Sequence, residues 1–233
     1  LTPIHDTPDA VFDGRCPDSS RHELLEKLSE TVDHQRADLG IAFDGDGDRI
    51  SIVDNDGVIL SGEESAAVLL GSFGEELAGE AFVYDLKFSE RMAEFAKSLQ
   101  ALPLVERSGH SFVRTRMLES GALFGAEVSG HYFYRELDGG DDAFYTACRL
   151  IDHLAQTGRP LSELRRVFPD VYLTPDLRVW VDPEDQPAVL EQVRSAWPDH
   201  PQTAVDGVRV QFPDGWALVR SSVTEPAMTF RFE

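Results

Sequence analysis

Lysine and cysteine are both scarce in this 233-residue chain, which contains three lysines among 21 basic residues and only two cysteines. The formal net charge is −21. Such an acidic protein lacks the broad basic surface that nucleic acid or an anionic membrane requires, because Lys and Arg provide most of that affinity. We therefore expect neither of these partners, and any anionic ligand needs a local basic pocket.

The cysteines and the apolar segments exclude further classes. Cys16 and Cys148 form no Cys-x-x-Cys pair, which argues against a zinc knuckle or a redox motif, and we expect two free, buried thiols. No apolar run approaches the ~20 residues that span a bilayer, and no signal peptide opens the chain. A soluble, cytoplasmic protein is predicted. The first residue is Leu1 rather than Met, which favours a piece of a longer protein.

Strand and helix patterns alternate through the middle of the chain, which predicts an α/β protein with a largely parallel sheet. Expected helices lie at 21–34, 63–78, 89–100 (opened by Ser89), 111–120 (opened by Ser111), 141–157 and 161–167. Expected strands lie at 39–43, 81–86, 102–107 and 122–128, with a hairpin at 50–60. After residues 168–170, further strands and one helix predict a small α+β unit with an antiparallel sheet. The expected units are 1–61, 62–168 and 169–233.

Three aspartates alternate with glycines in FDGDGDRI, residues 43–50: Asp44, Asp46 and Asp48, followed by Arg49. Carboxylates about 4 Å apart repel by roughly 4 kcal/mol at an effective dielectric near 20, so three that converge need a compensating cation. The preceding LGIAF reads as a buried strand whose end would face a crevice. The pattern favours a dication with oxygen ligands over a solvated acidic turn.

A calcium-binding helix-loop-helix is excluded at this loop. That motif needs glycine at its sixth position and a bidentate glutamate at its twelfth. Counting from Asp44, these positions hold Arg49 and Asn55, and a strand rather than a helix precedes the loop.

Two basic side chains lie at expected strand ends. His110, in ERSGHSFVRTRM, precedes a helix whose N-terminal N–H groups would suit a phosphate, although an exposed loop histidine is the alternative. Lys87 follows the strand AFVYDL and could reach a phosphoryl group, unless it is an ordinary surface lysine.

Two further stretches place polar side chains at alternate positions. Glu127, Ser129 and His131, in GAEVSGHYFYRE, would lie on one side of a strand end and suit sugar hydroxyls, with a solvated strand face as the alternative. The aromatic residues 132–134 are expected in the core. In VRSSVTEP a guanidinium and two hydroxyls could cradle a phosphate, or form a polar strand end. These are Arg220, Ser222 and Thr224.

Taken in this order, the stretches resemble the α-D-phosphohexomutase family, most closely its bacterial phosphomannomutase/phosphoglucomutase branch. DGDGDR is similar to the metal loop of the family. GHS and the Lys87 segment are similar to active-site parts of the third domain. EVSGH is similar to the sugar-specificity loop, and RSSVTEP is similar to the phosphate-binding loop of the fourth domain. The resemblance implies that the chain holds the later part of domain two, then domains three and four. The domain-one serine, in a Thr-Ala-Ser-His-Asn-like loop, has no counterpart in the sequence.

The resemblance also implies roles for these residues. Mg²⁺ would be bound by Asp44, Asp46 and Asp48, with a phosphoserine oxygen as a further ligand. Around the transferring phosphoryl group it places Arg49, Lys87 and His110. Sugar hydroxyls would be bound by Glu127, Ser129 and His131, and the idle phosphate by Arg220, Ser222 and Thr224. Two positions depart from the family pattern, Ala126 for a glycine and Val223 for an asparagine, and both bear on substrate affinity.

By this resemblance, the intact enzyme would interconvert hexose 1-phosphate and hexose 6-phosphate through a bisphosphate, while this chain alone would bind its ligands without turnover. A truncated, non-catalytic sugar-phosphate-binding module is the alternative. A metal-dependent phosphatase with an Asp nucleophile, which also starts from a strand-end D-x-D, is a third hypothesis.

Overall fold

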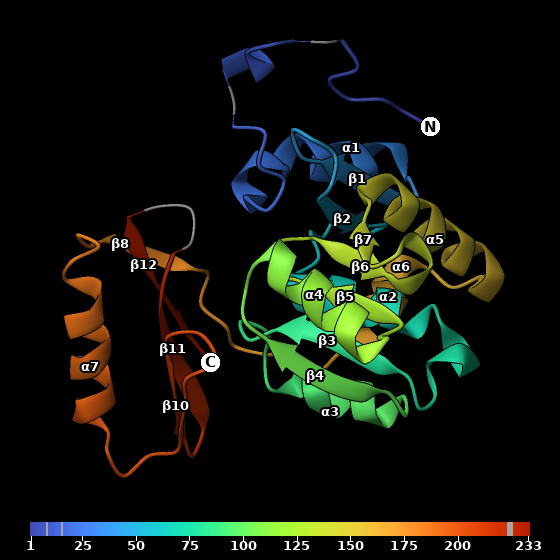
Figure 1. Cartoon of the computed structure of the whole chain (residues 1–233). Coiled ribbons are helices and arrows are strands. Elements are labelled where there is room, and N and C mark those ends of the chain that lie inside the picture. Colours follow the sequence, from blue (N-terminus) through green and yellow to red (C-terminus); the bar gives the residue numbers. More distant parts are fainter. Residues whose placement is uncertain (8, 15, 223–225) are drawn as a thin grey trace.

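The structure is a computed structural model that describes all residues except 8, 15 and 223–225. An α/β part and a C-terminal lobe, at the left of Figure 1, are joined by an extended segment. The helices are α1 Glu26–Gln35, α2 Gly62–Gly71, α3 Arg91–Ser98, α4 His110–Ser120, α5 Ala143–Thr157, α6 Leu161–Leu164 and α7 Gln186–Ala196. Short 3-10 helices lie at Phe12–Gly14, His22–Leu24, Gly74–Leu77, Arg135–Leu137 and Arg165–Val167.

The strands of the α/β part are β1 Leu39–Phe43, β2 Ile50–Asp54, β3 Ala81–Asp85, β4 Leu102–Glu106, β5 Phe124–Ala126, β6 Tyr132–Tyr134 and β7 Gly140–Asp141. Its larger sheet has the order β4-β3-β5-β6-β7. Strand β3 pairs in parallel with β4 and β5, whereas β6 and β7 are added antiparallel. The α/β class is therefore confirmed, with a mixed sheet.

The short strand β6 was not expected from the sequence because its side chains do not alternate between core and solvent. Tyr132, Phe133 and Tyr134 are all buried, as expected for core residues. Phe133 belongs to a cluster with Val113 and Met117 of α4, while both tyrosines belong to the cluster that includes α2 and α5. Helices thus cover both faces of this sheet, which removes the period-two pattern.

Strand β1 has the expected bounds, but the prediction that it is buried is wrong. Within the described part of the chain it pairs with β2 alone, in an antiparallel two-stranded sheet, and Phe43 is 45% exposed. Helix α1 packs against Gly40, where an added Cβ would lie 2.7 Å from Val32. A cavity of about 1000 Å³ lies between β1 and the N-terminal segment. The aspartate loop therefore follows a strand that is only partly buried.

Two helix starts differ from expectation. Helix α3 begins at Arg91, whose N–H donates to Ser89 Oγ at 3.1 Å, so Ser89 lies before the helix rather than at its cap. Helix α4 begins at His110 with Gly109 as its N-cap and no side-chain cap, so Ser111 lies inside the first turn. The φ of +136° at Gly109 lets the chain enter the helix two residues before the expected cap at Ser111.

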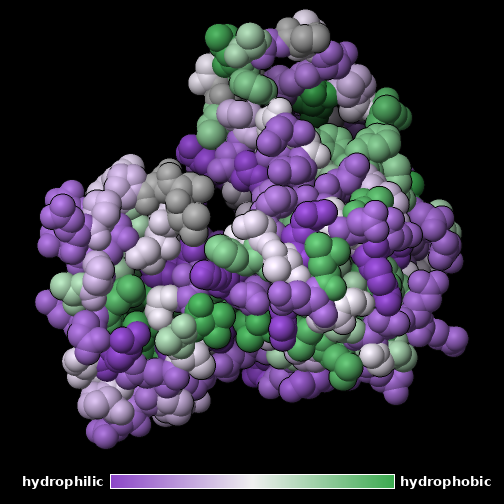
Figure 2. Space-filling model, in the orientation of Figure 1, coloured by the Kyte–Doolittle hydropathy of each residue, from purple (hydrophilic) through white to green (hydrophobic). Residues whose placement is uncertain are grey.

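The C-terminal lobe is the expected α+β unit. Its strands are β8 Leu177–Trp180, β9 Gln202–Thr203, β10 Val208–Phe212, β11 Gly215–Ser221 and β12 Ala227–Phe232. They form an antiparallel sheet in the order β8-β12-β11-β10-β9, and α7 lies beside it (Figure 1). The face drawn in Figure 2 is largely hydrophilic and is indented where this lobe meets the rest.

The prediction of buried thiols is wrong, since Cys16 and Cys148 are both free and exposed. Cys148 follows the buried Ala147 on α5, and one helical step turns a side chain by about 100°, enough to carry it from the core to the surface. Among the described residues, no helix has the length and apolar character needed to cross a membrane.

Candidate functional site

The aspartate loop between β1 and β2 is organised around the buried Asp44. Its Oδ1 accepts hydrogen bonds from the N–H groups of Gly47 and Arg49, both at 3.1 Å, and its Oδ2 accepts from Arg49 Nε at 2.7 Å. Burial raises the pKa of Asp44, but the backbone hydrogen bond and the charge of Arg49 outweigh this and lower it. Arg49 also donates to Asp18 at 3.0 Å, which anchors the loop to the N-terminal segment.

The three carboxylates of this loop can share one cation. Ligand oxygens from Asp44, Asp46 and Asp48 all lie within 4.8 Å of one another. Asp48 Oδ1 is inaccessible to solvent and accepts no hydrogen bond from the described residues. Burial, together with the charges of Asp44, Asp46 and Asp141, raises the pKa of Asp48 against the opposing effect of His131. An all-oxygen donor set of this kind fits Mg²⁺ or another hard dication.

The residues 127–131 converge through a turn rather than through strand alternation, so the expectation of a shared strand face is wrong. Strand β5 ends at Ala126, and the N–H of Glu127 donates to the carbonyl of His131 at 2.9 Å. Gly130 N donates to Glu127 O at 3.0 Å, and Ser129 Oγ donates to Glu127 Oε2 at 3.1 Å. The turn returns the chain into β6 and brings these polar side chains together.

A backbone contact docks the aspartate loop onto this turn. Arg49 and His131 form an isolated antiparallel bridge, and Ile50 N donates to Gly130 O at 3.1 Å. Gly130 has φ +96°, and an added Cβ would lie 2.6 Å from Ile50 O. Only glycine permits this close approach, which places Asp48 beside His131.

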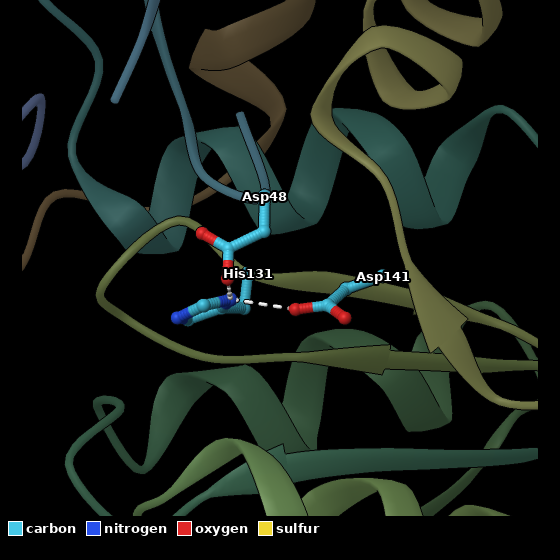
Figure 3. A group of neighbouring side chains, drawn as sticks. All are labelled: Asp48, His131 and Asp141. Carbon is cyan, nitrogen blue, oxygen red and sulfur yellow. Dashed lines mark hydrogen bonds and ion pairs between the residues drawn. The ribbon is translucent and has the colours of Figure 1, made fainter. Parts of the chain in front are cut away.

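Two histidines flank one carboxylate next to the loop. His131 Nδ1 lies 2.7 Å from Asp141 Oδ2 and 3.8 Å from Asp48 Oδ2, as Figure 3 shows. His110 Nε2 lies 3.5 Å from the other oxygen of Asp141. Burial lowers the pKa of His131, but its hydrogen bond with Asp141 and the charges of Glu127 and Asp48 raise it overall.

Glu127 is a buried acid with one unsatisfied oxygen. Its exposure is 4%, and Oε1 has no hydrogen-bond partner among the described residues. Burial, followed by the charge of Asp85, raises the pKa of Glu127 to about 7, while His131 and Lys87 oppose the shift. Near neutral pH this carboxyl can exchange between donor and acceptor states, which suits hydrogen bonds with hydroxyl groups.

Asp85, at the carboxyl end of β3, accepts hydrogen bonds from three loops. It is fully buried and accepts hydrogen bonds from Lys87 N at 2.7 Å, Ser108 Oγ at 3.3 Å and Val128 N at 3.4 Å. Lys87, which the sequence leaves as either functional or an ordinary surface lysine, is only 8% exposed. Its Nζ pairs with Asp176 Oδ2 at 3.1 Å, a residue of the segment that leads into the C-terminal lobe.

Arg220 and Ser222, two of the three residues expected to bind a phosphate, belong to the C-terminal lobe. Arg220, on β11, is buried, and its Nε pairs with Asp206 Oδ2 at 2.6 Å. Its Nη2 reaches Ser108 O at 3.5 Å, which places it near the segment that precedes His110. Ser222 N donates to Ala227 O at 2.8 Å, and Thr224 lies outside the described residues.

Sequence analysis missed several carboxylates that contact candidate site residues, among them Asp85, Asp141, Asp176 and Asp206. A signal existed only for Asp85, which directly follows the apolar residues of a strand, as Asp44 does. Asp141 stands in a short polar segment before α5, and the partners of the other two become visible only when the C-terminal lobe is in place.

The fold and the site define an α/β protein with a strand-end acidic loop facing basic side chains from a second sheet. Family models match it in two places: phosphoglucomutase/phosphomannomutase alpha/beta/alpha domain II over residues 1–57, and domain III of the same family over residues 61–172. The chain therefore belongs to the phosphoglucomutase/phosphomannomutase family.

Individual relatives agree with this assignment. The phosphomannomutase/phosphoglucomutase of Pseudomonas aeruginosa is 34% identical over 236 residues, covering 100% of this chain and 51% of the relative. A phosphoglucomutase of Neisseria gonorrhoeae is 33% identical over 231 residues, covering 97% of this chain and 50% of the relative. The chain thus spans about half the length of these curated relatives.

The solved structures include a crystal structure of a phosphoglucomutase/phosphomannomutase family protein from Burkholderia thailandensis. It superposes with a TM-score of 0.86 at 31% identity, over 97% of this chain and 48% of that one. A putative phosphomannomutase from Thermus thermophilus has a TM-score of 0.77 at 18% identity and covers 98% of this chain and 50% of that one, which shows a shared fold.

Proposed function

We propose that these 233 residues form the metal- and sugar-phosphate-binding part of a phosphohexomutase that interconverts hexose 1-phosphates and hexose 6-phosphates. Family membership supports the reaction class. The observation that carries the proposal is the docking of Arg49 against His131, which brings the metal-capable loop, a guanidinium and two imidazoles into one site. We also propose that the units 1–61, 62–168 and 169–233 are domains and that the protein acts in the cytoplasm.

The aspartate loop would hold Mg²⁺ through Asp44, Asp46 and Asp48, and the ion would neutralise phosphoryl charge. Arg49 stays rigid because Asp44 and Asp18 fix its Nε and Nη1. His110, 48% exposed at its side chain and at the start of α4, is accessible to a substrate hydroxyl. Arg49 and His110 could thus position the phosphoryl group and neutralise its charge, as phosphoryl transfer requires.

Sugar hydroxyls would be bound at the 127–131 turn. Glu127 Oε1 has no partner among the described residues, so a hydroxyl donor would satisfy it. Ser129 already bonds Glu127 and can accept from a second hydroxyl through its remaining lone pairs. His131 completes the set from the opposite side of the turn.

The phosphate groups would be bound by cations that carboxylates now neutralise. Lys87 pairs with Asp176, and Arg220 pairs with Asp206. An incoming phosphate has to replace these partners, so part of its binding free energy is spent on breaking them. We propose that Ser222 and Thr224 contribute further hydrogen bonds at the Arg220 phosphate.

Turnover in this proposal requires a serine that carries the phosphoryl group, and no Thr-Ala-Ser-His-Asn-like loop occurs in the printed sequence. A non-catalytic sugar-phosphate-binding module is thus the second candidate function. An in-frame upstream sequence with a Thr-x-Ser-His loop would favour the mutase over the module.

The test is ³¹P NMR of this chain with Mg²⁺, glucose 1-phosphate and a trace of glucose 1,6-bisphosphate. The glucose 1-phosphate signal should broaden without formation of glucose 6-phosphate. Arg220→Gln should weaken binding at least about tenfold, since a charged hydrogen bond contributes about 1.5–3 kcal/mol. Arg194→Gln, an exposed change in the same lobe, should have little effect. An unperturbed signal refutes the proposed binding, and formation of glucose 6-phosphate refutes the requirement for an added serine.

A further inference from the structure

Four metal-ligating side chains from four elements meet beside the aspartate loop. Asp48 precedes β2, His110 opens α4, His131 precedes β6 and Asp141 ends β7. The proposed function uses the histidines as substrate contacts and leaves Asp141 without a role. In Figure 3, His131 points its Nδ1 toward the carboxylates of both Asp48 and Asp141.

The spacing of these atoms suits a small cation with nitrogen and oxygen ligands. The Nδ1 atom of His131 lies 2.7 Å from Asp141 Oδ2 and 3.8 Å from Asp48 Oδ2, and one ligand atom from each residue lies within 4.8 Å of the others. Tetrahedral zinc with bonds of about 2.0–2.2 Å separates its ligands by roughly 3.4 Å, a value between the two nitrogen–oxygen distances. To reach this separation, the contact between His131 and Asp141 would lengthen by about 0.7 Å and that between His131 and Asp48 would shorten by about 0.4 Å, through side-chain rotation.

The position of the cluster also suits a bound cation. Asp141 and His131 are largely buried, with side-chain exposures of 9% and 14%. His110 Nε2 lies 3.5 Å from Asp141 Oδ1, outside the group of three mutually close ligands, and would become a fourth ligand only after its exposed side chain moves toward them. Asp48 offers its Oδ2 toward His131, while its Oδ1 lies 3.8 Å from Arg49 Nε. The negative charges of Asp44, Asp46 and Glu127 nearby add long-range attraction.

The donor type separates this cluster from the aspartate loop. Imidazole nitrogen favours Zn²⁺ and similar transition metals, whereas an all-carboxylate set suits Mg²⁺. We infer that Asp48, His131 and Asp141, assisted by His110, form a second metal site that binds Zn²⁺, with Asp48 shared between this site and the aspartate loop. Binding of zinc here does not depend on the proposed mutase function.

Occupancy of this site has a consequence for the proposed reaction. Zinc on His131 Nδ1 would replace the hydrogen bond with Asp141 that orients this imidazole, and it would hold Asp48 between two cations. Micromolar zinc should then weaken glucose 1-phosphate binding, a result that rests on the proposed function, unlike zinc binding itself.

The experiment is calorimetric titration of the 233-residue chain with Zn²⁺ in excess MgCl₂, with visible absorption of the Co²⁺ form as a second readout. One equivalent should bind, and Co²⁺ should show the intense bands of a four- or five-coordinate site. Asp141→Asn and His131→Gln should each weaken binding at least about tenfold, since even the loss of an outer partner of a metal ligand costs about 10–100-fold. Asp46→Asn should change zinc affinity far less.

Surface imidazoles and misfolding are controlled separately. His34→Ala removes an exposed histidine on α1 and should leave binding unchanged. Thermal unfolding of each variant without metal identifies any that fail to fold, and His131→Gln decides the question if Asp141→Asn is unfolded. The inference is overturned if zinc fails to bind the chain, if Asp141→Asn and His131→Gln bind as well as the wild type, or if only Asp46→Asn loses affinity.

Discussion

The backbones of Arg49 and His131 pair as an isolated antiparallel bridge, which joins the aspartate loop to the 127–131 turn. Ile50 N extends the contact to Gly130 O. The convergence of carboxylates and imidazoles thus depends on a backbone contact between two segments that are distant in the sequence. A substitution that leaves every candidate ligand in place can therefore disrupt the site.

Gly130→Ala should disrupt this contact. The φ of +96° and the 2.6 Å approach of an added Cβ to Ile50 O both oppose a side chain here. The free energy of unfolding should fall by about 1–3 kcal/mol, and Mg²⁺ affinity should fall with it. Urea denaturation and calorimetry measure the two effects.

Gly71→Ala provides the matched control. Gly71 ends α2 and has open space around an added Cβ, so alanine should be neutral or stabilise by up to about 1 kcal/mol. Equal losses in the two variants would show that glycine content in general, rather than the docking of Gly130, determines the effect.

Arg165→Met should destabilise the α/β part. Arg165 Nε pairs with Asp54 Oδ2 at 2.5 Å and its Nη1 with Glu64 at 2.8 Å, while the Asp54 side chain has 0% exposure. Removal leaves a buried carboxylate without its cation, which should cost about 3 kcal/mol in chemical denaturation. The neighbour Arg166 is 61% exposed and lies 3.6 Å from Asp56, so Arg166→Met should cost less than about 0.5 kcal/mol. Similar costs for both would contradict this account.

Stability should decrease as pH rises from about 4.5 toward 7 because of Glu127. Burial raises its folded pKa to about 7 from the ordinary 4.5 of a glutamate, so over this range the folded state holds a proton that the unfolded state has released. The unfolding free energy then falls with pH, by about 3 kcal/mol from this group across the window. Glu127→Gln should remove this contribution in denaturant titrations at several pH values. Glu119→Gln changes an exposed residue of α4 and should preserve the pH dependence of the unfolding free energy. If this pH dependence is unchanged in Glu127→Gln, another group causes it.

Asp46→Asn should weaken Mg²⁺ binding at least about tenfold, since it removes one of three converging carboxylates. Asp46 is exposed, so the fold should tolerate the change. Asp214→Asn also removes one negative charge, at an exposed turn between β10 and β11, and should leave Mg²⁺ affinity unchanged. Calorimetric titration compares the two variants, and retained affinity in Asp46→Asn would place Mg²⁺ binding elsewhere.

Most of the fold could be predicted from local sequence patterns. Strands β1 and β4 and helix α5 follow from apolar spacing and flanking turn residues, although β4 ends one residue earlier and α5 begins two residues later than expected. The short strands β6 and β7 could not, because Tyr132, Phe133 and Tyr134 are buried on both faces and Gly140–Asp141 is too short to show a period. The convergence of Glu127, Ser129 and His131 was expected, but the turn that produces it has no strand pattern.

By itself, the sequence determined the family, the α/β class and the aspartate loop with its metal-capable carboxylates, since each depends on residues close together in the chain. Only the tertiary structure decided which groups meet. It placed Asp141 against His131, Asp176 against Lys87 and Asp206 against Arg220. These pairs depend on strand order and on the docking of the C-terminal lobe, and such long-range packing leaves no periodic signal in the sequence.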